Sequence, residues 1–499
     1  MKVLNKKQAR DLDEQAQKLG IPGVLLMAYA AEALYERVSA AAQKCGTRIA
    51  VVCGSGNNGG DGYALVRLLV QRQAFSLCVV KAGGDAKSNE AKVFEQLVSR
   101  LDISIVNESD VNFNSFDVIV DCLFGIGLDR DISGHYAQVI QKMNASGAYV
   151  IACDIASGIN ADDGHIMGCA VKARETVSFA CGKMGLYTNE GIEHSGKITI
   201  ADLTIPDCLS ASYDGLSLLF KRDLRRFLPK RHIHSHKGSY GKLLMIGGRH
   251  GMSGALLLAA QAALRCGVGT CTLMSDELTL KAAAAIVPEA MQLRMPQLHD
   301  PAFLKLLTQY DVIAIGNGLG RDDEAAWLVE QVWQSECPAL FDGDALYVLG
   351  QPKTHSDRRS PYILTPHPKE LSYLLSMEVR KILKSPSETL KRSERAFSGG
   401  VLVLKNTSTM ITDGQHRYLY PGGNDGLAKG GSGDVLSGMI SGFWSQSTAL
   451  SAAVCGVILH AYCGDLLTSQ MSAYALLPGD LIKAIPDVLR NVINEKRVR

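Results

Sequence analysis

Short apolar runs alternate with segments of helical spacing along both halves of this 499-residue chain. Runs of four to six mostly apolar residues are typical of buried strands, and apolar residues three and four positions apart are typical of helices. In the first half this pattern predicts strands over residues 48–53, 75–80, 116–120 and 149–153, and helices over residues 62–72 and 86–100. Such an alternation indicates an α/β fold around a mainly parallel sheet.

The first half resembles a Rossmann-like three-layer sandwich, in which helices cover both faces of one sheet. The second half restarts the alternation, with strands expected over residues 242–246, 270–274, 311–315, 339–342, 362–365 and 401–404. Two long segments, residues 251–266 and 450–467, carry almost no charge. We predict that both are buried helices.

The chain is too long for a single hydrophobic core, which favours about two to four domains. Between the halves, a loop of polar and small residues leads into the charged stretch Lys221-Arg222-Asp223-Leu224-Arg225-Arg226. We place a linker there and predict two domains, over residues 1–213 and 221–499.

Composition narrows the class of partner. The formal charge is only +2, so no large electric field favours nucleic acid or an anionic membrane. No run reaches the roughly 18 uninterrupted apolar residues that a membrane span needs, and the N-terminus lacks the apolar core of a secretion signal. The 13 cysteines form no Cys-x-x-Cys pair, as expected for reduced thiols. We therefore expect a cytoplasmic protein with small-molecule partners, and a homo-oligomer of undefined size.

Three predicted strands of the first half end in polar, glycine-bearing loops. These loops are Gly54 to Gly62, Asp121 to Arg130 and Asp154 to Gly158. Ligands of open α/β sheets bind beyond the carboxyl ends of the strands, so the three loops should meet at one crevice. Asp121 and Asp154 each fit a general base, a ribose clamp, a cation ligand or a simple helix cap.

A second glycine-rich segment, residues 424–436, lies near the C-terminus and ends in Gly430-Gly431-Ser432-Gly433-Asp434 before an apolar helical pattern. Glycines let backbone N–H groups approach a phosphate closely, and the dipole of the following helix adds to the attraction. Asp434 would then face a substrate hydroxyl as a general base. The alternative is a glycine-rich turn in which Asp434 only caps the helix.

The first-half motifs, Asn57-Asn58-Gly59-Gly60-Asp61-Gly62 followed by residues 121–131 and 154–158, resemble those of the NAD(P)H-hydrate epimerase family. That family interconverts the R and S forms of hydrated NAD(P)H. The resemblance implies that Asp154 contacts the hydrate near the reacting ring, and we expect it to transfer the proton. It also implies a potassium ion held by Asn58, Asp121 and Ser157. The other implied hydrate contacts are Asn57, Asn58, Gly59, Gly60, Asp61, Gly125, Ile126, Gly127, Leu128, Asp129, Arg130 and Asp131.

One residue departs from the epimerase pattern. Ala156 stands where the family usually has proline. The loop is then less restricted in φ, while the flanking Asp154 and Ser157 are unchanged.

The second-half motifs resemble the ADP- or ATP-dependent NAD(P)H-hydrate dehydratase family, whose fold resembles the ribokinase-like kinases. The motifs are Gly316-Asn317-Gly318-Leu319-Gly320, Asp342-Gly343-Asp344, Thr365-Pro366-His367-Pro368, Lys405-Asn406-Thr407-Ser408-Thr409 and the segment ending in Asp434. The resemblance implies that Gly254, Gly318, His367 and Asp434 contact the hydrate. It implies that ADP or ATP binds with Mg²⁺ at Lys405, Asn406, Thr407, Ser408, Thr409 and Gly433.

The implied reaction transfers a phosphoryl group to the ring hydroxyl and then eliminates phosphate, a better leaving group than water. Two residues depart from the family pattern: Asn406 replaces a glycine and Asn317 replaces a proline. Asparagine tolerates the left-handed backbone, so we expect the loop at Asn406 to survive. We expect Asn317 to alter loop rigidity more than chemistry.

The resemblance covers nearly the whole chain and predicts a bifunctional enzyme that repairs hydrated NAD(P)H. Two alternatives remain open at this point. The second half fits a vitamin or sugar kinase that releases a stable phosphorylated product, and the first half fits a noncatalytic nucleotide-binding module. The choice between ADP and ATP is also open.

Overall fold

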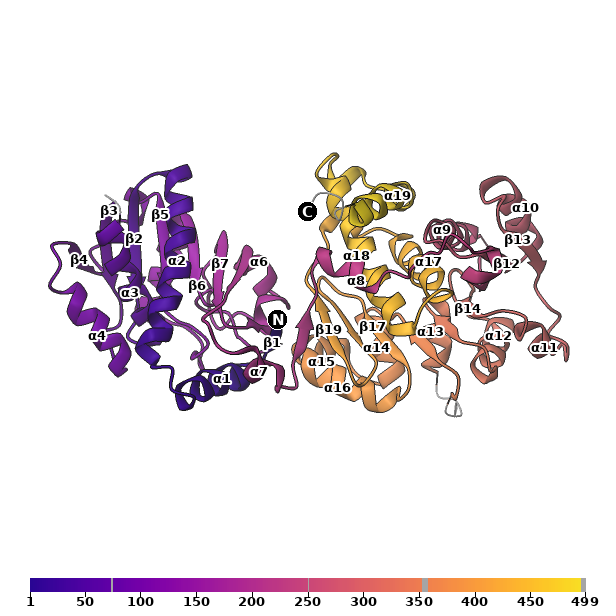
Figure 1. Ribbon diagram of the computed structural model, residues 1–499, viewed down its shortest axis with the longest axis horizontal. Helices are drawn as coiled ribbons and strands as arrows, with labels where there is room; N and C mark the ends of the chain where they lie inside the picture. The colour runs from indigo at the N-terminus through magenta and orange to yellow at the C-terminus, as the bar shows by residue number, and fades with distance from the viewer. Residues whose placement is uncertain (73–74, 250, 352–357, 495–499) are drawn as a thin grey trace. The chain divides into compact units, whose positions relative to one another are not determined.

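The computed structural model describes residues 1–72, 75–249, 251–351 and 358–494. The chain divides into two compact units, unit 1 (Met1–Ser217) and unit 2 (Leu218–Arg499). Both units combine a sheet with covering helices (Figure 1), so the predicted α/β class is confirmed.

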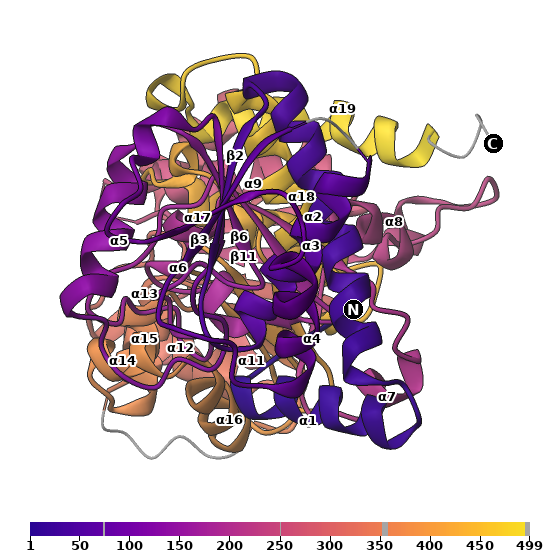
Figure 2. The same ribbon diagram turned by 90° about the vertical axis from the view of Figure 1, so that its left-hand side faces the viewer.

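Unit 1 is built on a seven-stranded parallel sheet in the order β4-β3-β2-β5-β6-β7-β9. The strand order changes direction between β2 and β5. Because crossovers between parallel strands are right-handed, this change puts successive helices on opposite faces. In Figure 2, α3 (Asn57–Arg72) and α4 (Asn89–Val98) lie on one face and α5 (Gly134–Ala145) on the other. The three-layer sandwich predicted for the first half is confirmed.

The four strands predicted in unit 1 are present as β2 (Arg48–Cys53), β3 (Ser76–Lys81), β5 (Val118–Cys122) and β6 (Tyr149–Cys153). Three further strands were not predicted: β4 (Ser104–Asn107), β7 (Glu175–Phe179) and β9 (Lys197–Ala201). β4 is an edge strand with mostly exposed side chains. β7 is fully buried although it contains polar residues. One of them, Glu175, forms an ion pair with Arg37. Neither strand shows the apolar run on which the prediction rested.

The core of unit 1 lies between the sheet and α2 (Gly23–Cys45). Leu34 and Val38 of α2 and Leu65 of α3 are buried in the same cluster as Ile49 and Val120 of the sheet. This packing fixes α3 relative to the sheet, and α3 carries part of the site described below.

The sheet of unit 2 runs in the order β13-β12-β11-β14-β15-β16-β17-β18-β19. It is parallel as far as β17 and antiparallel from β17 to β19. All six predicted strands are present, as β11 (Lys242–Ile246), β12 (Thr270–Ser275), β14 (Val312–Ile315), β15 (Ala339–Phe341), β16 (Tyr362–Leu364) and β17 (Val401–Leu404).

Three strands of unit 2 were not predicted: β13 (Met291–Arg294), β18 (Thr409–Thr412) and β19 (Arg417–Tyr420). β13 is an edge strand with exposed residues. β18 and β19 form a hairpin whose loop, residues 413–416, begins with Asp413-Gly414, and this pair of turn-forming residues was the available signal. Thr409, predicted to lie in a nucleotide loop, is therefore the first residue of a strand.

Three helices pack on the sheet of unit 2, α9 (Ser253–Arg265), α17 (Ser432–Trp444) and α18 (Ala449–Thr468), and α19 (Pro478–Asn494) packs on these helices. The two predicted buried helices are confirmed as α9 and α18. Among the described residues α18 is the one helix long and apolar enough to cross a membrane, and 72% of its most apolar window is buried inside the protein. That burial is expected of a core helix.

The remaining elements are short or lie at the periphery. In unit 1 they are β1 (Lys2–Leu4), α1 (Lys6–Lys18), β8 (Gly182–Lys183), α6 (Gly191–Ser195) and α7 (Asp207–Ala211). Near and beyond the division they are β10 (Leu216–Leu218), α8 (Leu224–Phe227), α10 (Glu277–Ile286), α11 (Phe303–Leu307), α12 (Asp323–Gln334), α13 (Asp344–Leu349), α14 (Pro368–Leu375), α15 (Val379–Lys384) and α16 (Pro386–Ala396).

Candidate active sites

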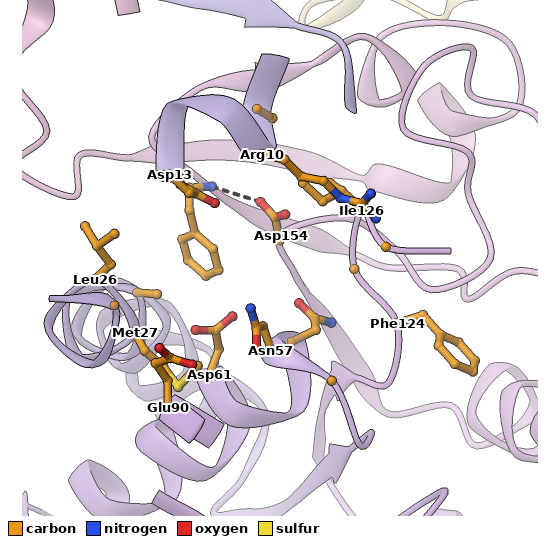
Figure 3. A pocket seen from close by; sticks show the side chains of 18 of the residues that line it. Arg10, Asp13, Leu26, Met27, Asn57, Asp61, Glu90, Phe124, Ile126 and Asp154 are labelled. Atoms are coloured by element: carbon orange, nitrogen blue, oxygen red, sulfur yellow. Dashed lines mark hydrogen bonds between the residues drawn. The ribbon is translucent and has the colours of Figure 1, made fainter. Parts of the chain in front are cut away.

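A cavity of about 790 Å³ opens at the carboxyl ends of β2, β5 and β6 in unit 1 (Figure 3). This is the position where the strand order changes direction, and where ligands of such sheets bind. The cavity is lined by most of the hydrate contacts that the resemblance implies, namely Asn57, Asn58, Asp61, Gly125, Ile126, Gly127, Leu128, Asp129, Arg130 and Asp154. Gly59, Gly60 and Asp131 are not among the lining residues.

The sequence suggested that the segment Asn57 to Asp61 is part of a loop. In the structure this segment is the start of helix α3. The glycines serve close packing there. A Cβ atom on Gly59 would stand 1.8 Å from the carbonyl oxygen of Gly54, and one on Gly60 would stand 2.7 Å from Met27. Because only glycine fits at position 59, the helix can begin directly above the end of β2 and present Asn57, Asn58 and Asp61 to the cavity.

Asp154 lies in a buried ion pair with Lys183 at the floor of the cavity. The Lys183 ammonium also donates to the Phe179 carbonyl oxygen at 2.9 Å and to Ser178 Oγ at 3.1 Å. The Phe179 N–H donates to Asp154 Oδ1 at 3.1 Å. Burial opposes the charged form of Lys183, but the Asp154 carboxylate outweighs it and raises the pKa of the lysine. Asp154 is thus a carboxylate held by one cation, with a left-handed φ of 65°.

Asp121 and Ser157, two of the predicted potassium ligands, are in direct contact. Ser157 donates to the fully buried Asp121 carboxylate through its N–H at 2.8 Å and its hydroxyl at 2.6 Å. Burial raises the pKa of Asp121 to about 6. The third predicted ligand, Asn58, faces Gly125, where a Cβ would stand 3.2 Å from Asn58 Oδ1.

The chemistry of this set fits a hard monovalent cation. Its donor atoms are oxygens, and its single carboxylate is bonded only to N–H and O–H donors among the described residues. The part of the chain that the structure describes contains no group of three or more His, Cys, Asp or Glu side chains able to hold a metal. A cation here would rely on amide and hydroxyl oxygens beside Asp121.

In unit 2, Asp434 lies in the first turn of α17, directly after the glycine-rich segment. Gly431 has a φ of 97°, which only glycine adopts readily, and this turn directs the backbone into the helix. Asn317 donates to Asp434 Oδ1 at 2.7 Å. Burial raises the pKa of Asp434 to about 6, although the Asn317 hydrogen bond opposes the rise. Asp434 is therefore a partly buried carboxylate that is ionised at neutral pH, and its pKa lies close enough to neutral pH for it to accept a proton.

The side chain of Asn317, which follows β14, is hydrogen-bonded to the segment after β15 and to helix α17. Its amide nitrogen lies 3.3 Å from Asp342 Oδ2, and its amide oxygen accepts from Ser437 Oγ at 3.2 Å. Asp342 in turn accepts from Lys405 Nζ at 2.8 Å and from Thr365 Oγ1 at 2.7 Å. Our expectation that Asn317 mainly alters loop rigidity misses these bonds, because the side chain contacts the predicted base itself.

Two of the predicted nucleotide contacts, Lys405 and Gly433, face each other. The Lys405 ammonium nitrogen is the nearest group to the open side of Gly433, 3.7 Å from where a Cβ would stand. Asn406 and Thr407 are exposed in the loop after β17, Ser408 is buried and Thr409 begins β18. The ammonium and the turn before α17 therefore lie side by side, and backbone N–H groups at such a helix start are able to bind an anion.

His367 caps helix α14. Its Nδ1 accepts from the N–H groups of Lys369 and Glu370 at 3.1 and 3.2 Å. Because Nδ1 is an acceptor, a neutral ring carries its proton on Nε2. Burial and the Lys405 charge lower the pKa of His367, which favours this neutral form. Gly254 has open space around its Cα, and Gly318 lies next to Asn317 with a left-handed φ of 62°.

Two family models match the chain. The model described as NAD(P)H-hydrate dehydratase matches residues 243–487, and the model described as YjeF-related protein N-terminus matches residues 24–185. A relative from Coxiella burnetii, named a bifunctional NAD(P)H-hydrate repair enzyme, is 35% identical over 95% of this chain and 96% of its own length. The chain belongs to this family. Enzymes of the same name from Moorella thermoacetica and Escherichia coli are 35% and 30% identical over 95% and 97% of this chain and 94% and 93% of their own lengths.

Solved structures of proteins similar to unit 2 support the predicted fold of this unit. The ADP/ATP-dependent NAD(P)H-hydrate dehydratase of Bacillus subtilis, co-crystallised with ATP/Mg²⁺, has a TM-score of 0.50 and 32% identity. The match covers 56% of this chain and 100% of that one. A ribokinase-like protein from Enterococcus faecalis has a TM-score of 0.51 and 28% identity over 56% of this chain and 97% of that one. The predicted ribokinase-like fold is confirmed.

Several residues of the two candidate sites were not predicted from the sequence. In unit 1, α1 contributes Arg10 and Asp13 to the cavity and β8 contributes Lys183. In unit 2, Asp342 connects Asn317 with Lys405. The Asp342-Gly343-Asp344 motif was visible in the sequence, whereas Arg10, Asp13 and Lys183 carry no local signal because they lie far along the chain from the glycine loops.

Proposed function

We propose that this chain repairs hydrated NAD(P)H in two steps. Unit 1 interconverts the R and S forms of the hydrate in its cavity, and unit 2 dehydrates the S form to NAD(P)H at the expense of ADP or ATP. The observation that carries the proposal is the contact set of Asp434. A carboxylate poised near neutrality lies at the start of a helix whose glycine turn faces the Lys405 ammonium.

For dehydration, we assign Asp434 as the base that takes the proton of the ring hydroxyl while the nucleotide transfers its terminal phosphoryl group to that oxygen. The N–H groups of Gly430 to Gly433 and the Lys405 ammonium stabilise the phosphate charge. Phosphate then leaves with the electrons of the C–O bond and takes up the proton of the neighbouring ring carbon, whose C–H electrons restore the double bond. His367 would donate from Nε2 to the hydrate.

Mg²⁺ bound with the nucleotide would neutralise phosphate charge in unit 2. Asp342 and Asp344, whose charges both act on Asp434, offer the carboxylate oxygens that Mg²⁺ prefers. Both carboxylates also have cationic partners, Lys405 and Arg321. This arrangement supports a cation held mainly by the phosphates, with carboxylate help.

For epimerisation, we assign Asp154 as the base, oriented by its ion pair with Lys183. Asn58, Asp121 and Ser157 would hold a potassium ion, which would fix the loop after β5 and attract the negatively charged phosphates of the hydrate. The carboxylate of Asp121 would provide the charge that such an ion needs.

The cellular location and the oligomeric state of the protein are predictions. All 13 cysteines are free, which is what the reducing cytoplasm maintains, and we infer a cytoplasmic enzyme on that ground. We also propose a homo-oligomer, the commonest form of soluble assembly.

Asn317 is expected to set the pH dependence of dehydration. Asp434 must be ionised to accept a proton, so kcat/KM falls as the pH drops through its pKa of about 6. Removing the Asn317 hydrogen bond in Asn317→Ala raises this pKa, and the acid limb should move up by about one pH unit, since hydrogen bonds to charged groups contribute about 1.5–3 kcal/mol. The matched control is Ser437→Ala, which removes a bond to Asn317 but none to Asp434. An unshifted acid limb in Asn317→Ala would speak against the assignment.

The function is tested by mixing the purified chain with each hydrate in a separate reaction and following the absorbance of the reduced nicotinamide that forms. S-hydrate with ADP or ATP should recover fully, and R-hydrate should recover at a rate that exceeds spontaneous epimerisation. Replacing potassium by lithium should slow only the R-hydrate reaction. No recovery from S-hydrate, with phosphorylation of pyridoxal or a hydroxymethyl-pyrimidine instead, would favour the kinase alternative.

A further inference from the structure

The cavity of unit 1 brings three carboxyl groups to one ammonium. Asp13 comes from α1, Asp61 from α3 and Asp154 from the end of β6, and all three line the cavity with Lys183 (Figure 3). The proposed function uses Asp154 as a base and leaves Asp61 without an assigned proton. Three acidic groups near one ammonium cannot all be ionised cheaply in a buried site, so their protonation states must differ.

The hydrogen bonds show which carboxyl group the ammonium serves. Lys183 donates to Asp154, Ser178 and Phe179, and within the part of the chain that the structure describes it makes no hydrogen bond to Asp61. Among the described residues, the one hydrogen bond to Asp61 is a weak contact from Cys153 Sγ to Oδ2 at 3.9 Å. Asp61 is half-buried, and its open surface faces the cavity. Its carboxyl group is therefore free to act on a bound molecule.

The surroundings of Asp61 favour its neutral form. Burial raises the pKa of Asp61 well above its usual range, and the negative charges of Asp154 and Asp13 raise it further, against the opposing effect of Lys183. By contrast, burial raises the pKa of Asp13 only to about 6, so Asp13 is largely ionised at neutral pH. Besides Asp61, the titratable and charged groups that line the cavity are Arg10, Asp13, Lys87, Glu90, Asp129, Arg130, Asp154, Cys181 and Lys183, and Cys153 contacts Asp61.

We propose that Asp61 is the general acid of the epimerase, working with Asp154 as the general base on the two sides of one ring carbon–nitrogen bond. This inference rests on the proposed epimerase function. It assigns opposite roles to two carboxyl groups of one cavity because one is hydrogen-bonded to the Lys183 ammonium and the other is not.

The step balances as a ring opening. Asp154 takes the proton of the ring hydroxyl, the hydroxyl oxygen forms a carbonyl, and the bond between that carbon and the ring nitrogen breaks. The electron pair goes to the nitrogen, which takes the proton of Asp61. After the freed carbonyl rotates, the reverse steps close the ring from the other face. Asp61 and Asp154 end in the protonation states in which they began, so no outside proton is needed.

The decisive variant is Asp61→Asn in the full chain, assayed with R-hydrate and with S-hydrate. Asparagine has the size and neutral charge of the protonated acid but no acidic proton. We expect kcat for epimerisation to fall about 100-fold with KM little changed, the lower end of what a positioned acid contributes. Asp85→Asn is the matched control, because it removes an exposed carboxylate of the same unit that does not line the cavity, and it should keep the epimerase rate. Dehydration of S-hydrate by the same Asp61→Asn chain should be unchanged.

A second measurement needs no variant. The epimerase rate of the wild-type chain should decline at alkaline pH as Asp61 loses its proton, and the infrared carbonyl band of one protonated carboxylic acid should disappear over the same pH interval. An Asp61→Asn chain that epimerises as fast as the wild type, or a rate with no alkaline decline, would overturn the assignment. A wild-type chain that fails to interconvert the two forms would instead refute the proposed epimerase function.

Discussion

Asp434→Asn is expected to dehydrate S-hydrate about a thousand-fold more slowly than the wild-type chain, with KM little changed, because a positioned general base contributes about 10²- to 10⁴-fold. Asparagine can still accept the Asn317 hydrogen bond but cannot accept a proton. The measurement is the initial rate of absorbance recovery at saturating ADP or ATP.

Folding provides the control for Asp434→Asn. The folded-state pKa of Asp434, about 6, lies above the ordinary value of 3.8, so the carboxylate lowers the stability of the folded chain as the pH rises from about 3.8 to about 6, and the loss is complete above that. Removing that charge should leave the Tm of unit 2 equal or higher at neutral pH. Asp487→Asn is the control variant, since its carboxylate is exposed on α19 and pairs with Arg490; it should keep the wild-type rate. A wild-type rate in Asp434→Asn would contradict the assignment.

Lys183→Met is expected to destabilise unit 1 by about 3–5 kcal/mol, because it leaves the buried Asp154 carboxylate without its cation. For a unit of this size, such a loss should lower the Tm by about 10 °C. Epimerisation should fall to the spontaneous rate, since Lys183 would no longer orient the Asp154 base. Thermal unfolding and the R-hydrate assay measure the two effects, and S-hydrate dehydration below the Tm should be unaffected.

The double variant Lys183→Met with Asp154→Leu separates charge from packing. Replacing both partners by apolar side chains removes the unpaired charge, so the Tm should return most of the way to that of the wild type. The epimerase activity should stay absent, because the base is gone. If Lys183→Met alone were as stable as the wild-type chain, the ion pair would not have the structural weight assigned to it.

The layered folds of both units were predictable because buried parallel strands form continuous apolar runs, as in β2 and β14. Strands without such runs were not. Edge strands β4 and β13 expose most of their side chains, and β7 buries a glutamate that only its partner Arg37 makes tolerable. A pattern of hydrophobicity does not contain that tertiary pairing.

The site residues divide in the same way. Glycine-bearing loops mark the strand ends locally, so Asp61, Asp154 and Asp434 could be named from the sequence. Lys183 could not, because it reaches Asp154 only through the placement of β8. Asn317 looked like a change in loop rigidity, and only the folded arrangement brings its amide within hydrogen-bonding distance of Asp434.

The fate of one oxygen atom tests the central claim, that dehydration in unit 2 runs through phosphorylation of the ring hydroxyl. S-hydrate carrying a heavy oxygen isotope in that hydroxyl would be incubated with the wild-type chain and nucleotide, and the inorganic phosphate analysed by mass spectrometry. We predict the label in phosphate, because the carbon–oxygen bond breaks only after the oxygen has bonded to phosphorus. Label recovered in water would contradict the mechanism.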